Sequence, residues 1–279
     1  MELQRTHACA PVTTRGRGLL LSANGADTLA FANGKSVYTI TVKTRAVEAY
    51  QEHTAACTVA RFSPCGKLLC TGDAAGGARL WAVGAASSQL QVSALAGSVN
   101  DLALSRDLKT LYVCGEGRGR LACAFNAETG VLLGQLSGLA RPANSLDLSG
   151  DGQRVATGDD SGTVHAHDSS APFKSRLCVQ DQGGRAVNCV RFAPASSAFV
   201  TAGGRALLLY SGDGVAPTEL AGHSGSVYCC AWRPDGAQIL TARAAAAAPH
   251  AGPLTRARGP HRRARTRPCG CTTPPQLAR

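Results

Sequence analysis

Aromatic and charged residues are both scarce in this sequence of 279 residues, at 5% and 17%. Long apolar runs are absent as well: stretches such as 206–210 and 244–248 are far shorter than the roughly 20 residues of a membrane-spanning helix. The first twenty residues carry scattered arginines and no apolar segment typical of a secretory signal. Hydrophobic residues make up 44% of the chain, so we expect a sizeable core rather than global disorder. These features predict a soluble intracellular protein that does not interact with membranes.

The 12 cysteines do not show the spacing of a zinc site or a disulfide-rich scaffold. None belongs to a Cys-x-x-Cys pair, and no histidine lies at zinc-ligand spacing. Eight of them lie within or beside apolar strand-like segments: Cys57, Cys70, Cys114, Cys123, Cys178, Cys189, Cys229 and Cys230. The pattern predicts small buried thiols in a reducing compartment, with no metal site.

The net charge of +11 is concentrated near the end of the chain. Residues 243–279 contain eight arginines and no acidic residue, which leaves +3 for residues 1–242. The segment has no hydrophobic periodicity, so it cannot bury enough surface to order itself. We therefore divide the chain into a repeat domain, residues 1–243, and a disordered basic tail, residues 244–279.

Two interpretations of this tail stay open. A genuine basic extension would bind nucleic acid or anionic lipid, with 263–267 (RARTR) as its core. A read-through intron, a frame shift or a truncated gene model would instead make the tail an artefact. We favour the second interpretation, because the repeat pattern breaks between two strands and would leave a strand edge uncovered. Nucleic acid is accordingly not an expected partner.

A four-residue turn recurs along the chain at intervals of 42, 44, 44 and 40 residues. Its copies are 63–66 (SPCG), 105–108 (SRDL), 149–152 (SGDG), 193–196 (APAS) and 233–236 (RPDG), with a degenerate earlier copy at 24–27. Proline presets the first corner of such turns, aspartate bonds its own backbone and glycine accepts a positive φ. The recurrence indicates an internal repeat of about forty residues.

Each turn connects two strand-like segments, and two more strands complete the repeat. The first three strands are clear in 57–63, 68–74 and 78–83, and the fourth in 131–138. Four short strands per forty-odd residues are typical of a β-propeller blade. A lone four-stranded meander cannot bury both of its faces, whereas stacked blades bury them against each other. The sequence predicts an all-β propeller of about five to six blades.

Residues typical of WD40 repeats occur in degenerate form. Gly222-His223 is the Gly-His pair before an inner strand, Glu52-His53 replaces it in an earlier repeat, and Trp81-Ala82 stands where Trp-Asp is usual. We expect His53, Thr71 and Trp81 to form the hydrogen-bond network that stabilises such a blade. His223 is expected to have the same structural, non-catalytic role in a later repeat.

Three segments resemble one family of WD40 proteins, that of actin-interacting protein 1, also called WD-repeat protein 1. They are 32–37 (ANGKSV) with 52–53, 60–64 and 71–73; 113–118 (VCGEGR); and 156–160 (ATGDD) with 171–174 (APFK) and 187–192 (VNCVRF). The resemblance runs from about residue 15 to residue 242. Members of this family have two seven-bladed propellers, so it implies an incomplete N-terminal propeller. An open arc of this kind would be marginally stable, with exposed strand edges.

The resemblance implies an actin-binding role without catalysis and without a cofactor. Family members bind actin filaments decorated by cofilin (ADF) and promote their disassembly. Actin filaments and cofilin are thus the implied partners, and the cytoplasmic actin cytoskeleton the implied location. Carried over motif by motif, the actin-facing residues are Glu116, Asp159, Phe173 and Lys174. Two aromatics of the family pattern are replaced here, by Ser175 and Ala186, and aromatic anchors often dominate interfaces.

Plainer interpretations apply to each of these residues. Glu116 and Lys174 have the features of solvated surface charges, and acids such as Asp159 commonly bond a turn backbone. A WD40 scaffold for a complex unrelated to actin is the alternative function. An enzyme is not expected: His165 and His167 share one face of a strand, but no third metal ligand follows at a suitable spacing.

Overall fold

The predicted all-β propeller architecture is confirmed. The computed structural model describes residues 21–180, 183–211, 216–223, 225–243 and 256–258. These residues form strands β1–β23, grouped into five four-stranded sheets and one three-stranded sheet. Within each sheet, neighbouring strands are antiparallel and follow one another in sequence, as in a meander. We call the six sheets blades 1–6 in chain order.

The first three blades each have four strands. Blade 1 contains β1 (Ser22–Ala23), β2 (Thr28–Asn33), β3 (Ser36–Thr41) and β4 (Val47–Tyr50). Blade 2 contains β5 (Cys57–Phe62), β6 (Leu68–Asp73), β7 (Gly77–Ala82) and β8 (Ser88–Ser93). Blade 3 contains β9 (Val99–Leu104), β10 (Thr110–Gly115), β11 (Ala122–Asn126) and β12 (Leu132–Gln135).

The pattern continues through blades 4 and 5 and ends in a smaller blade 6. Blade 4 contains β13 (Ala143–Leu148), β14 (Arg154–Asp159), β15 (Thr163–Asp168) and β16 (Ser175–Gln180). Blade 5 contains β17 (Val187–Phe192), β18 (Phe199–Gly203), β19 (Ala206–Tyr210) and β20 (Thr218–Glu219). Blade 6 contains β21 (Val227–Trp232), β22 (Gln238–Arg243) and β23 (Arg256–Arg258).

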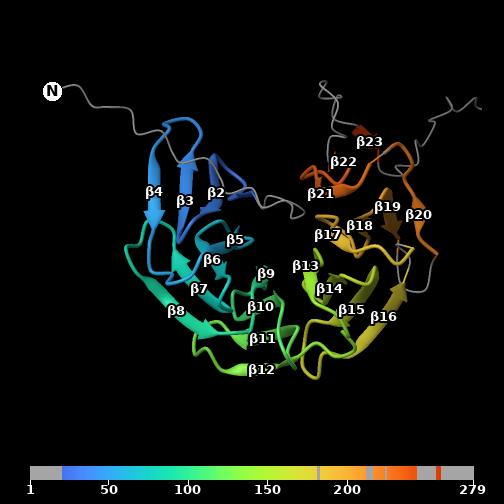
Figure 1. Cartoon of the computed structure of the whole chain (residues 1–279). Coiled ribbons are helices and arrows are strands. Elements are labelled where there is room, and N and C mark those ends of the chain that lie inside the picture. The colour runs from blue at the N-terminus through green and yellow to red at the C-terminus, as the bar shows by residue number, and fades with distance from the viewer. Residues whose placement is uncertain (1–20, 181–182, 212–215, 224, 244–255, 259–279) are drawn as a thin grey trace, which may run out of the picture.

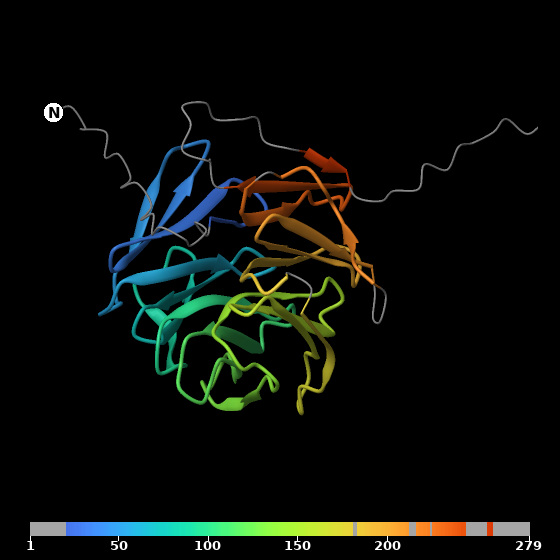
Figure 2. The same cartoon turned by 45° about the vertical axis from the view of Figure 1, so that its right-hand side comes forward.

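The blades are arranged as an arc around a common centre, with the first strand of each blade innermost (Figure 1). Figure 2 shows the sheets of neighbouring blades lying face to face. The inner strands β5, β9, β13, β17 and β21 contact one another in sequence around the centre. Among the described strands, none of blade 1 pairs with one of blade 6, so the arc is not closed by strand pairing.

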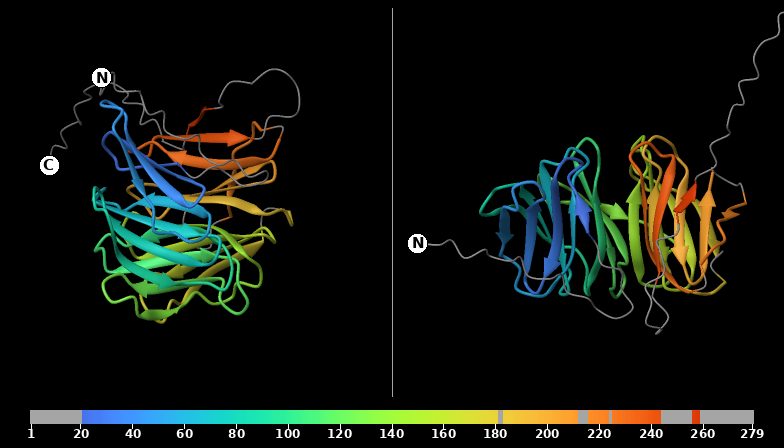
Figure 3. Two further views of the ribbon diagram at one scale, coloured as in Figure 1. Left: turned by 60° about the vertical axis from the view of Figure 1, so that its left-hand side comes forward. Right: turned by 90° about the horizontal axis from the view of Figure 1, so that it is seen from above.

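The strands run between two faces of the arc, as the view from above in Figure 3 shows. One face carries the turns between the first and second strands and the loops between the third and fourth; we call it the turn face. The other carries the loops between the second and third strands and those between blades; we call it the loop face. Backbone bonds connect the segments on each face, for example Ser169 N to Gln153 O on the turn face and Asp160 N to Pro142 O on the loop face.

Small residues at the end of the second strand allow neighbouring blades to approach closely. A Cβ atom on Gly158, at the end of β14, would lie 2.3 Å from the side chain of Val187 in blade 5. The equivalent Gly72 would bring its Cβ within 2.5 Å of Val99 in blade 3. Since real Cβ atoms do not approach this closely, glycine is required at both contacts. The apolar clusters that result extend from one blade into the next, as Val155 and Phe173 with Tyr112 show.

The end of the chain departs in one respect from the sequence-based prediction. Most of the predicted disordered tail, including residues 263–267, lies outside the described residues. The three described ones, Arg256–Arg258, form β23 and pair with β22, so β22 is not the uncovered edge that the sequence pattern predicts. In the part of the chain that the structure describes, no helix is long and apolar enough to span a bilayer.

Candidate functional site

Blade 2 contains a buried chain of hydrogen bonds that includes His53, Thr71 and Trp81. His53 lies before β5, Thr71 on β6 and Trp81 on β7. Thr71 Oγ1 lies 2.7 Å from His53 Nε2 and 3.0 Å from Trp81 Nε1. His53 Nδ1 lies 2.7 Å from a carboxylate oxygen of Asp73, a fourth member that sequence reasoning missed. The sequence feature that could have identified Asp73 is its position directly after Thr71-Gly72, at the end of a strand.

These contacts are consistent with a neutral His53. Its Nδ1–H would donate to Asp73, and its Nε2 would accept from the Thr71 hydroxyl, whose oxygen accepts from the Trp81 indole N–H. Burial lowers the pKa of His53 below its ordinary value of 6.5, although the hydrogen bond that His53 donates to Asp73 opposes the shift. The network ties the segment before β5 to strands β6 and β7, and it is inaccessible to a substrate because its four residues are buried.

The other predicted network residue, His223, lies in blade 6. Its Nε2 is 2.8 Å from Thr241 Oγ1 on β22, which repeats the His53–Thr71 contact. Blade 4 departs from this pattern: His167 takes the position of Trp81 on the third strand, and its Nε2 donates to the carbonyl of Ser137 at 2.7 Å. His165 stacks on His167 with ring centroids 6.2 Å apart. Blades 2 and 6 therefore share the histidine–threonine hydrogen bond, whereas the histidine of blade 4 bonds a backbone carbonyl instead.

Four inner strands are connected at the centre by buried ion pairs. Asp101 on β9 is fully buried and lies 3.3 Å from Arg61 on β5 and 3.2 Å from Arg191 on β17. Its carboxylate also accepts from Ser145 Oγ and the backbone N–H of Leu146 on β13, both at 3.0 Å. One carboxylate therefore joins blades 2, 3, 4 and 5. Sequence reasoning did not find this cluster.

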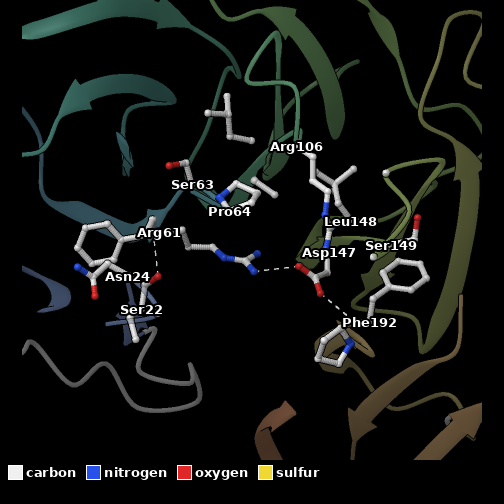
Figure 4. Close-up of a pocket in the computed structure, with 18 of the residues that line it drawn as sticks. Ser22, Asn24, Arg61, Ser63, Pro64, Arg106, Asp147, Leu148, Ser149 and Phe192 are labelled. Atoms are coloured by element: carbon white, nitrogen blue, oxygen red, sulfur yellow. Dashed lines mark hydrogen bonds and ion pairs between the residues drawn. The ribbon is translucent and has the colours of Figure 1, made fainter. Parts of the chain in front are cut away.

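A cavity of about 370 Å³ opens beside this cluster, lined by Arg61, Asp147 and residues of the first-to-second-strand turns. Figure 4 shows Arg61 pointing across it to Asp147, at 2.9 Å, while the other carboxylate oxygen of Asp147 accepts from the backbone N–H of Phe192. The two charged side chains that meet across the cavity, Arg61 and Asp147, are thus paired with each other. The cavity opens on the turn face, between the inner strands of blades 1–5.

Two of the residues carried over from the family resemblance lie on the loop face. Glu116 follows β10 and is partly exposed, and its backbone N–H donates to Ser98 O. Asp159, at the end of β14, is 1% exposed, and one of its carboxylate oxygens accepts from the N–H groups of Ser161 and Thr163. The exposed acid of this loop is the neighbouring Asp160. Asp159 therefore shapes the loop and does not present its carboxylate to a partner.

The other two carried-over residues lie on the turn face, between β15 and β16. Phe173 is 3% exposed and packs edge-on against Tyr112, with ring centroids 6.3 Å apart. Its ring also fills the space beside Gly134, so it belongs to the core and does not compensate at the surface for the replaced aromatics. Lys174 is exposed, as is Ser175 next to it. The structure therefore places Lys174 on the opposite face from Glu116.

The loop face over blades 3–5 is rich in arginine. Five arginines on the loops of this face are exposed: Arg118, Arg120, Arg141, Arg185 and Arg205. Glu116 and Asp160 lie among them. A surface of this kind favours a partner with a predominantly acidic surface. Within the described ranges, no cluster of three or more His, Cys, Asp or Glu side chains is arranged to hold a metal ion.

Comparison with known proteins is consistent with this architecture. The family model described as WD domain, G-beta repeat matches residues 44–82, 130–168 and 214–245. Actin-interacting protein 1 of Drosophila melanogaster is 34% identical over 254 residues, which cover 86% of this chain and 41% of that protein. Actin-interacting protein 1-2 of Arabidopsis thaliana is 36% identical over 240 residues, covering 82% of this chain and 39% of that protein.

A vertebrate relative gives a similar match. WD repeat-containing protein 1 of Rattus norvegicus is 32% identical over 251 residues, which cover 86% of this chain and 41% of that protein. The chain thus spans about two fifths of the length of the curated relatives it matches. The repeated blades and these similarities together show a chain of WD40 repeats that is similar, over 82–86% of its length, to proteins named actin-interacting protein 1 and WD repeat-containing protein 1.

Proposed function

We propose that this chain binds actin filaments and promotes their disassembly together with cofilin (ADF), as a non-enzymatic scaffold of the cytoplasmic actin cytoskeleton. The observation that carries the proposal is similarity along 86% of the chain to a protein named for its interaction with actin. Stacked blades form a platform whose loops are free to specialise in binding. The proposal involves no cofactor and no small-molecule substrate.

The proposed contact surface has two parts. The first is the loop face over blades 3–5, where Glu116 and the exposed Asp160 lie among arginines. The second is the exposed Lys174 on the turn face, at the outer loop of blade 4. A filament decorated with a second protein presents several surfaces, so contacts on two faces of one arc are compatible with a single binding mode.

Co-sedimentation with actin filaments, with and without cofilin, tests the proposal. We expect the chain to pellet with cofilin-decorated filaments and only weakly with bare ones. Glu116→Ala and Lys174→Ala should each weaken binding by at least about 5-fold, the effect of losing an interface residue worth roughly 1 kcal/mol. Lys67→Ala, an exposed lysine of the same turn face in blade 2, is the matched control and should bind normally.

The alternative function is a scaffold for a complex unrelated to actin. Phe173 and Asp159 are buried, and Ser175 and Ala186 stand where the family pattern has aromatics, so two of the four residues carried over from the resemblance are not exposed for binding. Absence of binding to either kind of filament, by a chain with the circular dichroism of a folded β protein, would favour this alternative. Equal binding to bare and decorated filaments would retain actin as the partner and reject the role of cofilin.

A further inference from the structure

Two buried cysteines meet at the contact between blades 5 and 6. Cys189 lies on β17 and Cys230 on β21, and their Sγ atoms are 3.5 Å apart. Both thiols are free, and the two residues are only 1% and 2% exposed. The strands belong to different sheets, so a bond between these sulfurs would add a covalent cross-link to a blade contact made by side-chain packing and hydrogen bonds such as that from Val227 N to Gly204 O.

The geometry is close to that of a disulfide. Bonded sulfurs lie about 2.05 Å apart, so the two Sγ atoms need to approach each other by about 1.5 Å. The β17 and β21 backbones already pack together, and Cys189 Sγ also contacts Cys230 O at 3.7 Å. Rotation of the two side chains can provide this approach with little movement of the strands.

The surroundings favour reaction at Cys189. Hydrogen bonds from the thiols of Cys229 and Cys230 hold the pKa of Cys189 well below its usual value, and the guanidinium of Arg191 adds to this effect. The thiolate is the reactive form of cysteine toward oxidants. Cys229, the neighbour of Cys230, is only partly buried, so the cluster lies near the surface on one side.

We propose that Cys189 and Cys230 are an oxidation site at which a peroxide forms a disulfide between blades 5 and 6. In the first step the Cys189 thiolate attacks one oxygen of hydrogen peroxide, and the O–O bond breaks to give a sulfenic acid and hydroxide. In the second step the Cys230 sulfur attacks the Cys189 sulfur, so that the S–S bond forms and the S–O bond breaks. The leaving hydroxide takes up the Cys230 proton as water. The two thiols lose two electrons, and one peroxide is reduced to water.

The disulfide would restrict the separation of blade 6 from blade 5. In the described residues blade 6 packs on blade 5 through β17 and β18, and its strands pair with none of blade 1. A cross-link at this contact therefore acts on the blade at the end of the arc. Oxidation would make that blade harder to detach, independently of any interaction with actin.

Mass spectrometry of the full chain after treatment with hydrogen peroxide tests the site. Free thiols are alkylated under denaturing conditions, and digested peptides are compared with and without reduction. We expect a linked pair of peptides containing Cys189 and Cys230. Limited digestion of the native protein with chymotrypsin should also cleave after Trp232, the last residue of β21, more slowly in the oxidised protein than in the reduced one.

Three variants make the test specific. Cys230→Ala and Cys189→Ala should abolish both the linked peptide and the slower cleavage after Trp232. Cys229→Ala should retain both, because it leaves the proposed pair intact. A wild-type chain that shows native circular dichroism but forms no Cys189–Cys230 link would overturn the proposal, as would a Cys189–Cys229 link in its place. If a variant does not fold, the wild-type peptide map alone decides the outcome.

Discussion

Replacement of Asp101 by asparagine tests whether one buried carboxylate holds the inner strands together. Asp101 is fully buried and faces Arg61 and Arg191 at 3.3 and 3.2 Å. Asparagine keeps the shape but removes the charge, and its amide group can accept hydrogen bonds through only one atom. The variant therefore leaves two mostly buried guanidinium groups without their shared counterion.

The magnitude follows from the contacts that remain. Removing one partner of a buried ion pair typically costs about 3–5 kcal/mol. Arg61 keeps its ion pair with Asp147 at 2.9 Å, which reduces the loss of stability that results from Arg61. Arg191 keeps only neutral partners, including Ser145 Oγ at 3.0 Å. We therefore expect Asp101→Asn to lower the free energy of unfolding by about 3 kcal/mol, at the lower end of that range.

Urea unfolding followed by tryptophan fluorescence measures this loss as a shift of the midpoint at constant slope. Asp168→Asn is the matched control, because Asp168 pairs with Arg176 in an exposed ion pair that should contribute far less. The loss at Asp101 should persist in high salt, since buried pairs are screened little. A midpoint for Asp101→Asn equal to that of the control would refute the reasoning. Recovery of stability by adding Arg191→Met would support it.

Other predictions concern packing and pH. Gly158→Ala should destabilise the chain by about 1–3 kcal/mol, because its Cβ would lie 2.3 Å from Val187; Val187→Ala in the same chain should restore part of the loss in urea unfolding. Phe173→Ala should cost about 3–5 kcal/mol in the same assay, as expected for a buried core aromatic, and an effect near zero would contradict its burial. Burial lowers the pKa of His53 and His167 below 6.5, so the unfolded chain binds more protons. Stability should therefore be unaffected by these groups above about pH 6.5 and fall as the pH drops below it, and thermal unfolding at pH 5–8 measures this.

Local patterns were sufficient to predict the blades. A recurring turn such as Ser149–Gly152 depends only on residues close in the chain: Gly152 has a φ of 72°, and the Ser149 hydroxyl accepts from the N–H of Arg154. Similarly, His53, Thr71 and Trp81 lie at characteristic places in the WD40 repeat, and the structure brings them into one network. Such features are encoded within about thirty residues, so a single sequence reveals them.

Which loop side chains face inward was harder to predict from the sequence than the blades were. Asp159 and Asp160 are adjacent acids, and only the bonds to the N–H groups of Ser161 and Thr163 show that Asp159 faces inward. Phe173 follows a proline in a loop, where an aromatic has the features of a surface anchor. Its burial depends on Tyr112 and Gly134 in the preceding blade, which the sequence does not identify as neighbours.

By itself the sequence determined the repeat, the strand order within each blade and the family resemblance, because turn chemistry and strand alternation act between residues close in the chain. Only the tertiary structure decided which distant residues meet. Asp101 is 40 residues from Arg61 and 90 from Arg191, and Cys189 is 41 from Cys230. Stacking of the blades around a centre brings these positions together, since each blade places its first strand against that of the next.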